Sequence, residues 1–399
     1  MPADSDTTAS GGARPLPPQR DLFEIPEDIA YFNCASLAPQ LKAARQAAES
    51  ALQRRAQPWL IRGDDWFTEV EQRRALFAQI AGVDPEGVAL VPATSYGLAA
   101  AAANLRAGPG QRVVVLAEEY PSNYYTWQRF AGRTGAAVTV VGRQAGQAWG
   151  EAVLGALDER AAVVAVPAVH WTDGAVVDLV AVGARARQVG AALVVDASQS
   201  LGAMPLDLAA IRPDYLVTVG YKWLLGPFGL GYLYVAPQHR DGVPLEENWI
   251  ARLGSEDFSG LVSYQERYQP GARRFDVGQR THFEITAPAI ATLRQLLDWG
   301  VDRIAATLGQ ITGRIEEAVR GEGLVLTSPD RGPHMLGIRL PELARKRVAL
   351  ALTEAGVHVG MRGASLRVSP HLWTTDQDVD RLAAALADAA NGRNAIGAP

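Results

Sequence analysis

Lys222 is the residue whose neighbours in the sequence most clearly indicate a chemical role. It is one of only three lysines in the chain, and it follows an apolar run and stands between Tyr221 and Trp223. Burial among aromatic and aliphatic side chains lowers the pKa of a lysine and frees its amine to attack an aldehyde. Lys42 and Lys346 fall in predicted helices beside polar residues, where a solvated charge is the simpler interpretation. We therefore expect Lys222 to be reactive, although taken alone it could be a surface lysine.

Asp196 and Gln199 form a second candidate group, directly after another apolar run. An acid at the end of a buried strand is costly unless a partner needs its charge. The nitrogen of a pyridine ring is such a partner, because a buried carboxylate keeps it protonated and strengthens the ring as an electron sink. Gln199 could then reach a hydroxyl on the same ring. Taken alone, however, Asp196 is better explained as a helix cap or a structural acid.

Three further candidates follow other apolar runs. Thr94 and Ser95 enter a predicted helix, where hydroxyls and backbone amides bind phosphate well, although helix capping explains them equally. Tyr120 could stack on a flat ring or be an ordinary aromatic residue of a loop. His170 could act in acid–base chemistry, and a structural histidine is about as good an explanation.

The apolar runs that precede these residues predict strands. Several are rich in valine and almost uninterrupted, as strands buried on both faces of a sheet are. The predicted strands are 88–91, 113–116, 137–141, 162–166, 191–195, 215–219 and 232–235. Helical spacing occurs before and between them, at 42–56, 66–81, 97–105, 149–157 and 179–189. This alternation predicts an α/β domain with a mostly parallel sheet, whose strand ends would gather the candidate residues at one edge.

The last quarter of the chain has a different pattern, which predicts a smaller α+β domain. The predicted helices are 290–299, 301–319, 341–355 and 376–390, and the predicted strands are 324–326, 335–339, 357–360 and 365–368. Residues 1–20 are rich in Pro, Gly, Ser and Ala without periodicity, which predicts a flexible tail. We therefore divide the chain into a tail (1–20), an N-terminal segment with a large domain (21–285) and a small C-terminal domain (286–399).

Composition narrows the functional classes. The 399-residue chain has a net charge of −5, so no overall basic field attracts nucleic acid. No apolar run reaches the roughly 18 residues that a membrane helix needs, and the N-terminus lacks a secretory pattern. Cys34 is the only cysteine, and the six histidines show no metal-ligand spacing, so we expect no disulfide and no metal site. We expect a cytoplasmic protein that binds neither nucleic acid nor membrane.

The chain resembles the class V aminotransferase family of pyridoxal 5′-phosphate (PLP) enzymes, of fold type I. The strongest piece is Asp196-Ala-Ser-Gln199 followed by Tyr221-Lys222, and the likeness runs from about Tyr31 to Ala390. This family includes cysteine desulfurases, kynureninases and proteins similar to isopenicillin N epimerase. The resemblance implies PLP as the cofactor, held by Lys222 as a Schiff base, within the large domain.

The resemblance also implies roles for individual residues. Asp196 would pair with the ring nitrogen, Gln199 with the ring oxygen, Tyr120 would stack on the ring, and Thr172 would lie beside it. Thr94, Ser95 and Tyr221 would hold the phosphate. Arg367 would bind the α-carboxylate of an amino-acid substrate, a task that suits a bidentate guanidinium. The segment from Arg274 to Arg280, with Gln279, would reach the phosphate of a neighbouring subunit, which implies a homodimer with shared active sites.

The sequence leaves the reaction open. An amino acid would displace Lys222 as an external aldimine, and Lys222 would then remove its Cα proton, leading to transamination or a β-elimination. An epimerase of the isopenicillin N epimerase type is an alternative that ranks lower, because Lys222 supplies a base on one face only. Residues 360–365 contain no cysteine, which argues against a cysteine desulfurase. Kynureninases usually have histidine at the position of Gln199, which weakens that assignment.

Two other classes of protein fit the sequence less well than a PLP enzyme of this family. A nicotinamide-dependent dehydrogenase is a poor alternative, because Gly226, Gly229 and Gly231 have the wrong spacing and precede a strand instead of opening a helix. A non-catalytic relative that keeps the fold as a scaffold is disfavoured, because Lys222 and its candidate partners are all retained.

Overall fold

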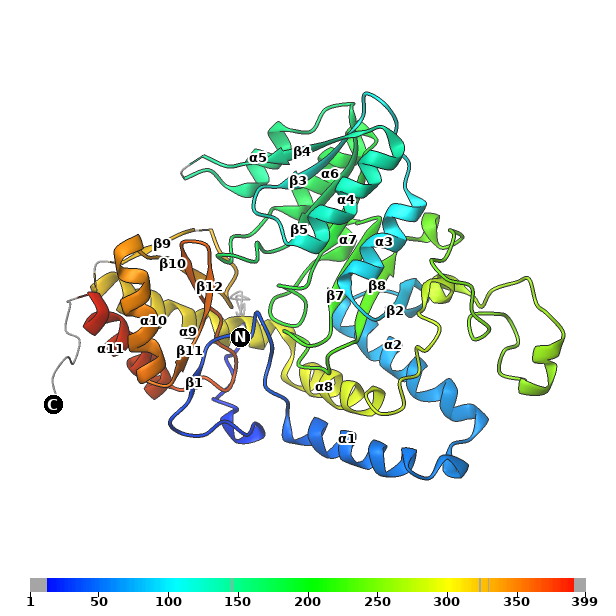
Figure 1. Cartoon of the computed structure of the whole chain (residues 1–399), viewed down its shortest axis with the longest axis horizontal. Coiled ribbons are helices and arrows are strands. Elements are labelled where there is room, and N and C mark those ends of the chain that lie inside the picture. The colour runs from blue at the N-terminus through cyan, green and yellow to red at the C-terminus, as the bar shows by residue number, and fades with distance from the viewer. Residues whose placement is uncertain (1–12, 145, 323, 329, 391–399) are drawn as a thin grey trace, which may run out of the picture.

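A sheet of seven strands forms the centre of the large domain in the computed structural model, which describes residues 13–144, 146–322, 324–328 and 330–390 (Figure 1). The strand order is β2-β8-β7-β6-β5-β3-β4, and all neighbours are parallel except those of β8. The strands are β2 (Val88–Val91), β3 (Arg112–Leu116), β4 (Ala137–Val141), β5 (Ala161–Pro167), β6 (Ala192–Asp196), β7 (Tyr215–Val219) and β8 (Gly231–Val235). The predicted α/β architecture with a mostly parallel sheet is confirmed.

Helices cover both faces of this sheet. Successive residues of a strand point to opposite faces, so alternate residues enter two hydrophobic cores, as Val113 and Val114 do. One core contains α3 (Thr94–Asn104) and α4 (Pro121–Thr134). The other contains α1 (Lys42–Arg55), α2 (Thr68–Ala81), α5 (Trp149–Gly155), α6 (Leu179–Val189), α7 (Leu208–Ile211) and α8 (Thr286–Trp299). Helix α4 is an addition to the predicted helices. It begins at Pro121, and proline is favoured at the first position of a helix although it also occurs in loops.

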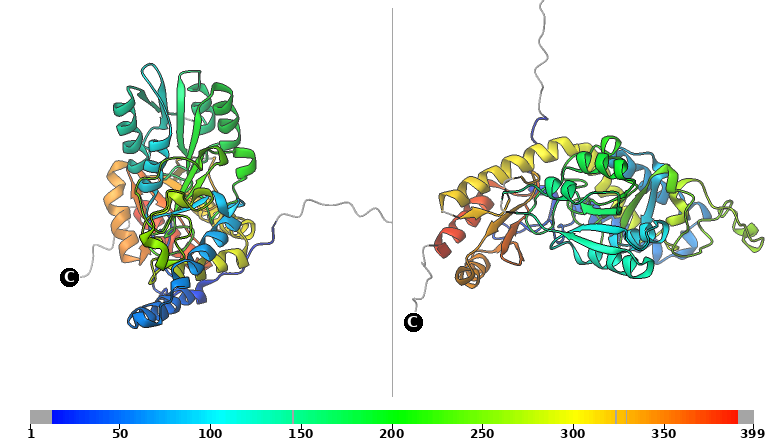
Figure 2. Two further views of the ribbon diagram at one scale, coloured as in Figure 1. Left: turned by 90° about the vertical axis from the view of Figure 1, so that its right-hand side faces the viewer. Right: turned by 90° about the horizontal axis from the view of Figure 1, so that it is seen from above.

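The small domain is built on an antiparallel sheet of four strands in the order β12-β13-β10-β9. These strands are β9 (Val325–Leu326), β10 (Leu336–Arg339), β12 (Gly360–Arg362) and β13 (Ser365–Val368). Its helices are α9 (Val301–Gly321), α10 (Arg345–Glu354) and α11 (Asp376–Ala390). The right-hand view of Figure 2 shows α9, in yellow, running from the large domain along the small one. In the described chain no helix is long and apolar enough to cross a membrane.

The N-terminal segment ties the two domains together. Strand β1 (Ala30–Tyr31) pairs in parallel with β11 (Val357–His358) of the small domain, while α1 packs against α8. Residues 1–12 of the predicted flexible tail lie outside the described part. Residues 13–20 make specific contacts: the Leu16 amide donates to the Thr307 hydroxyl (2.8 Å), and the Gln19 amide donates to the Leu372 carbonyl (2.7 Å). Leu16 is also buried, and these two hydrogen bonds join residues 16 and 19 to α9 and to the loop that follows β13.

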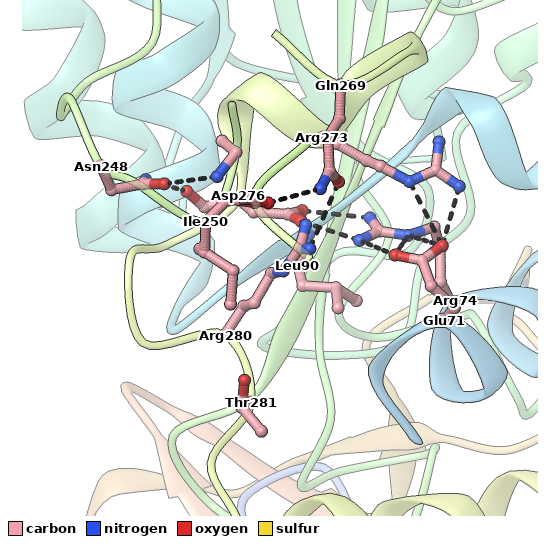
Figure 3. A network of polar contacts seen from close by, with 12 residues as sticks. Glu71, Arg74, Leu90, Asn248, Ile250, Gln269, Arg273, Asp276, Arg280 and Thr281 are labelled. Carbon is pink, nitrogen blue, oxygen red and sulfur yellow. Dashed lines mark hydrogen bonds and ion pairs between the residues drawn. The ribbon is translucent and has the colours of Figure 1, made fainter. Parts of the chain in front are cut away.

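A buried network of charges fixes the segment that follows β8 to the sheet (Figure 3). Asp276 accepts hydrogen bonds from Arg74 Nη2 (2.7 Å), Arg280 Nη1 (2.6 Å) and the Leu90 amide (2.7 Å). Burial alone would raise the pKa of Asp276, but the two guanidinium groups outweigh burial and lower it. Every charge in the centre of this network is thus opposed by another charge, and the network holds the segment from residue 269 to 281 against β2.

Candidate active site

A cavity of about 220 Å³ lies at the carboxyl edge of the large sheet. The parallel strands end at this edge, so the loops after β2, β3, β5, β6 and β7 converge there. The predicted site residues that line the cavity are Thr94, Ser95, Tyr120, Asp196, Gln199, Tyr221 and Lys222. The topology therefore brings together side chains that are more than 120 residues apart in the sequence, from Thr94 to Lys222.

Lys222 lies in the wall of this cavity and is only 7% exposed. Its Nζ is 5.4 Å from the centre of the Tyr120 ring and 5.9 Å from that of Tyr221. Burial lowers the pKa of Lys222 to about 8; the charge of Asp196 opposes this shift, whereas Arg367 and Arg362 add to it. A much larger fraction of this amine is therefore uncharged near neutral pH than of an ordinary lysine, and the uncharged form is the nucleophile.

Asp196 ends strand β6 and is buried beneath the same cavity. Its Oδ1 accepts a hydrogen bond from the Ser198 amide (2.9 Å), and no ion pair to Asp196 forms within the described residues. Burial raises its pKa, and the charge of Lys222 only partly offsets that effect. A buried carboxylate without a cationic partner is prepared to bind one, and a protonated ring nitrogen would meet this need.

The first turn of α3 forms another wall. Thr94 Oγ1 shares a hydrogen bond with Ser198 Oγ (3.0 Å), while the side chain of Ser95 is exposed at the cavity. Helix α3 reaches this position because Gly97 packs directly on β7: a Cβ at residue 97 would lie only 2.7 Å from Val217 Cγ2. The free amides and hydroxyls at this helix start suit a phosphate group.

Gln199 and Tyr120 also line the cavity, and contacts with other residues hold both side chains. Gln199 is held at both ends of its amide, because Nε2 donates to the Ala35 carbonyl (3.0 Å) and Oε1 accepts from Trp223 Nε1 (2.9 Å). One amide hydrogen of Gln199 remains for a ligand. Tyr120 meets Trp171 edge to face at 5.5 Å and leaves its ring beside the cavity. These contacts fix the orientation of both side chains before any ligand binds.

Two predicted residues lie away from the cavity. Thr172 Oγ1 is hydrogen-bonded to His170 Nδ1 (2.8 Å), and Thr172 lines a second, neighbouring cavity instead. His170 itself is buried and stacked on Trp149, and burial lowers its pKa, which indicates a structural role. Gln279 is exposed on the surface of this chain. It follows that neither Thr172 nor Gln279 lines the cofactor-sized cavity of its own chain.

Arg367 lies beside the cavity, on β13 of the small domain, and is almost fully buried. Its Nη1 donates to the Trp171 carbonyl (2.8 Å) and its Nη2 to Ser36 Oγ (2.6 Å), but its Nε has no hydrogen-bond partner. Gly360 leaves room for this group, because a Cβ there would lie 3.3 Å from Nε and Nη2. Burial, followed by the charge of Arg362, lowers the pKa of Arg367 to about 9. In the part of the chain that the structure describes, no carboxylate forms an ion pair with Arg367, and such a buried guanidinium is suited to an anionic ligand.

The sequence did not single out Glu119, Trp171 or Ser198, which all line the cavity. Glu119 Oε1 accepts a hydrogen bond from the Tyr120 amide (2.7 Å), while Oε2 is buried without a partner. Burial, and then the nearby charge of Asp196, raise the pKa of Glu119 to about 8. The signal for Glu119 was present, because it follows an apolar strand as Asp196 does.

The donor set of this cavity fits PLP. The lysine amine would take the aldehyde, the unpaired carboxylate of Asp196 the ring nitrogen, and the start of α3 the phosphate. The close packing of α3 on β7 through Gly97 also leaves the helix start free at the cavity. Each polar group of the cofactor therefore has a complementary group of the protein within this one cavity.

Comparisons with known proteins agree with this site. The family model "Aminotransferase class-V" matches residues 60–382. An uncharacterized aminotransferase, YcbU, of Bacillus subtilis is 30% identical, over 82% of this chain and 87% of its own. A kynureninase of Geobacillus thermodenitrificans is 26% identical, over 92% of this chain and 89% of its own.

Among solved structures, a lysine-to-alanine variant of the cystine C–S lyase C-DES, with glycine covalently linked to its PLP cofactor, has the same fold. Its TM-score is 0.84 at 18% identity, and the match covers 93% of this chain and 99% of that chain. This likeness shows that almost the whole chain shares the fold of that structure. The chain belongs to the class V aminotransferase family and is a PLP-dependent enzyme.

Proposed function

We propose that the protein removes the Cα proton of an amino-acid substrate, with Lys222 as the base, in a transamination or a β-elimination. The observation that carries this proposal is a buried lysine amine of lowered pKa close to an acid, Asp196, and a guanidinium, Arg367, neither of which forms an ion pair within the described residues. PLP, when bound, supplies a protonated ring that takes up the electrons of the Cα–H bond. Because one relative is an aminotransferase and another a kynureninase, the reaction has to be inferred from the site.

The residues of the cavity divide into those that hold the cofactor and those that handle the substrate. For the cofactor we assign the ring nitrogen to Asp196, the ring oxygen to Gln199, stacking to Tyr120, and the phosphate to Thr94, Ser95 and Tyr221. Arg367 is assigned to the substrate α-carboxylate, which would complete the hydrogen bonding of its free Nε. Lys222, released from its covalent role, carries the proton. Thr172 is left out, because its hydroxyl is already bound to His170.

An epimerase needs a second base on the opposite side of Cα, and the described cavity offers poor candidates for one. Glu119 and Tyr221 hold their protons near neutral pH, because burial raises both pKa values. Desulfurase chemistry also lacks its nucleophile. Cys34, the only thiol, is buried with its Sγ directed at the Lys222 carbonyl (3.8 Å), and burial raises its pKa. Lys222 as the one mobile base favours transamination or β-elimination.

We also infer that the protein works as a homodimer in the cytoplasm. Gln279 and its neighbours are anchored by the buried Asp276 network, yet Gln279 itself points to the surface. A rigid, exposed segment of this kind suits a role in a neighbouring subunit's phosphate site. A single, buried cysteine is in keeping with a reducing compartment.

The visible absorption spectrum of the purified, PLP-supplemented protein tests the proposed function. We expect a yellow band that particular amino acids shift. A keto acid formed without ammonia would indicate transamination, a keto acid formed with ammonia a β-elimination, and an inverted amino acid an epimerase. A protein that binds no PLP, or whose band responds to no amino acid, would overturn the proposal and favour a scaffold role.

A further inference from the structure

A second cavity, of about 750 Å³, adjoins the first. The two cavities share Glu119 and Trp171 in their walls. One side of the second cavity comes from the loops after β3 and β5 of the large domain, and the other from the sheet of the small domain. Trp171 and Glu119 therefore contact both spaces, and the second cavity lies next to the one that contains Lys222.

The second cavity carries an excess of positive charge. Four arginines line it, and of these Arg143 is paired with Asp173 (2.7 Å). Within the described residues, Arg339, Arg345 and Arg362 form no ion pair. The only other acids in the lining are Glu118 and Glu119, and Glu119 is mostly uncharged at neutral pH because burial raises its pKa to about 8. Three unpaired arginines thus face one charged acid.

Polar atoms of this cavity are also left without partners. Arg345 Nε and Ser365 Oγ are both buried and form no hydrogen bond with any residue that the structure describes. Burying such groups unpaired costs free energy, so a polar ligand that satisfies them gains affinity. Arg362 lies over the ring of Trp171, at 5.5 Å, which holds its guanidinium at the junction of the two cavities. The unpartnered atoms and the charge excess both call for an anion.

The register of the small sheet relates these arginines to Arg367. Residues paired directly across strands point to the same face, and so do residues two apart on one strand. The two neighbouring rows are Gly360–Arg367–Gly337 and Arg362–Ser365–Arg339. The second row is therefore on the face of Arg367 and about 7 Å further along the strands. Ser36 Oγ links the rows, since it accepts from both Arg367 (2.6 Å) and Arg362 (3.0 Å).

We propose that Arg339, Arg345 and Arg362 bind a second carboxylate of the substrate, so that the enzyme acts on amino acids whose side chain ends in a carboxylate. This inference rests on the proposed function, in which Arg367 takes the α-carboxylate. A substrate held there places its side chain along the ring of Trp171 and its distal carboxylate at the second arginine row. Guanidinium groups bind carboxylates with charge-assisted, bidentate hydrogen bonds, which an amide or an alkyl group cannot replace.

The test is a spectroscopic titration of the PLP-loaded protein with matched pairs of amino acids. L-Glutamate is compared with L-glutamine, L-aspartate with L-asparagine, and L-2-aminoadipate with L-norleucine. We expect the acidic member to bind at least about tenfold more tightly, as a charged hydrogen bond predicts. Glutarate, which has no amine, is expected to compete with L-glutamate, whereas butyrate is not.

Variants locate the effect. We expect two single variants, Arg339→Gln and Arg345→Gln, each to weaken the binding of L-glutamate about tenfold. The affinity for L-glutamine should stay the same in both variants, and Arg339 is at an exposed position. Arg362→Gln is less specific, because it also removes the contact with Ser36. The matched control is Arg320→Gln, on the outer surface of α9, where the side chain is 67% exposed. This variant should change the affinity for neither L-glutamate nor L-glutamine.

The outcomes separate this inference from the proposed function. If amides bind as tightly as acids, or if Arg339→Gln and Arg345→Gln leave the ratio unchanged, the distal carboxylate site is wrong while the enzyme assignment stands. If no amino acid alters the spectrum of the PLP-loaded protein, the proposed function fails and this inference falls with it. Circular dichroism of each variant confirms that its fold is intact.

Discussion

Two groups of buried charges in this molecule differ in whether their charges form ion pairs. Around Asp276, each central charge has opposite charges within hydrogen-bond distance, as Figure 3 shows for Arg74 and Arg280. Around Lys222, the described structure leaves Asp196, Arg367 and the amine itself without ion pairs. Paired buried charges can hold elements in register, whereas unpaired ones are costly and mark sites that await a ligand.

Two buried aspartates show this difference in the opposite directions of their pKa shifts. Asp276 and Asp196 are both buried at the edge of the same sheet. The pKa of Asp276 is lowered because Arg74 and Arg280 outweigh burial, whereas the pKa of Asp196 is raised because burial dominates. The same residue type at similar depth is thus a structural anion in one place and an unsatisfied acid in the other. The presence or absence of a cation within hydrogen-bond distance accounts for the contrast.

The largest effect is expected for Lys222→Ala. This change removes the amine that would bind PLP covalently, so we expect complete loss of the yellow band and of amino-acid turnover. Because the lysine is buried without an ion-pair partner, its removal should not lower the thermal midpoint of the cofactor-free protein. Lys42→Ala, on the exposed surface of α1, is the control. Retention of the band in Lys222→Ala would show that another residue binds the cofactor.

The next largest effect separates the two aspartates. Asp276→Asn leaves two buried guanidinium groups without a counter-charge, and should lower the free energy of unfolding by about 3–5 kcal/mol. Asp196→Asn should leave the stability of the cofactor-free protein unchanged or raise it, while weakening PLP binding. Urea unfolding of the cofactor-free proteins measures the first effect, and PLP titration the second. Equal losses of stability in the two variants would contradict the distinction drawn between the two charge groups.

The sequence predicted much of the fold because its strands are buried on both faces. The predicted bounds of β2 and β7 equal the observed ones, since buried apolar stretches of this kind fit few other structures. The bounds of β4 also agree, although β4 is a partly exposed strand at the edge of the sheet. The order of the strands then brings their carboxyl ends together. The sequence could place Thr94, Asp196 and Lys222 near one another for this reason: Asp196 ends a buried strand, and Thr94 and Lys222 each come three residues after one.

What the sequence could not give depends on contacts between distant segments. Trp171 lines the cavity while its neighbours His170 and Thr172 bind each other, and the sequence offers no sign of this choice. Arg362 belongs to the site only because β12 packs beside β13 and across from Trp171. The segment at Leu16 was assigned to a tail by composition, yet a single buried leucine and two backbone hydrogen bonds hold it in place.

A smaller, pH-dependent effect is expected for Glu119. Its pKa is raised from 4.5 to about 8, so the folded protein binds more protons than the unfolded chain between these values. The stability that protonated Glu119 contributes is therefore present below about pH 4.5 and is lost as the pH rises through 8. The glutamine in Glu119→Gln stays neutral at every pH. The free energy of unfolding of this variant should therefore be higher than that of the wild type by a few kcal/mol at pH 9, and by much less at pH 5.

Urea unfolding of the cofactor-free protein at pH 5 and pH 9 measures this difference. Glu118→Gln, one residue earlier and exposed, is the matched control and is expected to show no such dependence. A difference between Glu119→Gln and the wild type that does not change with pH would contradict a protonated Glu119.

The smallest effect compares two buried arginines. Arg367→Gln should weaken amino-acid binding by about 10- to 100-fold, the loss of charged hydrogen bonds to one carboxylate, without lowering the stability of the cofactor-free protein. Arg74→Gln should do the reverse, because it leaves Asp276 with one guanidinium and Glu71 with Arg273 alone, and Arg74 does not line the cavity. Spectroscopic titration and urea unfolding of both variants give the two readouts. If Arg367→Gln destabilised the protein as much as Arg74→Gln, its guanidinium would be a structural charge whose contacts with Ser36 and the Trp171 carbonyl suffice, and the substrate carboxylate would have to bind elsewhere.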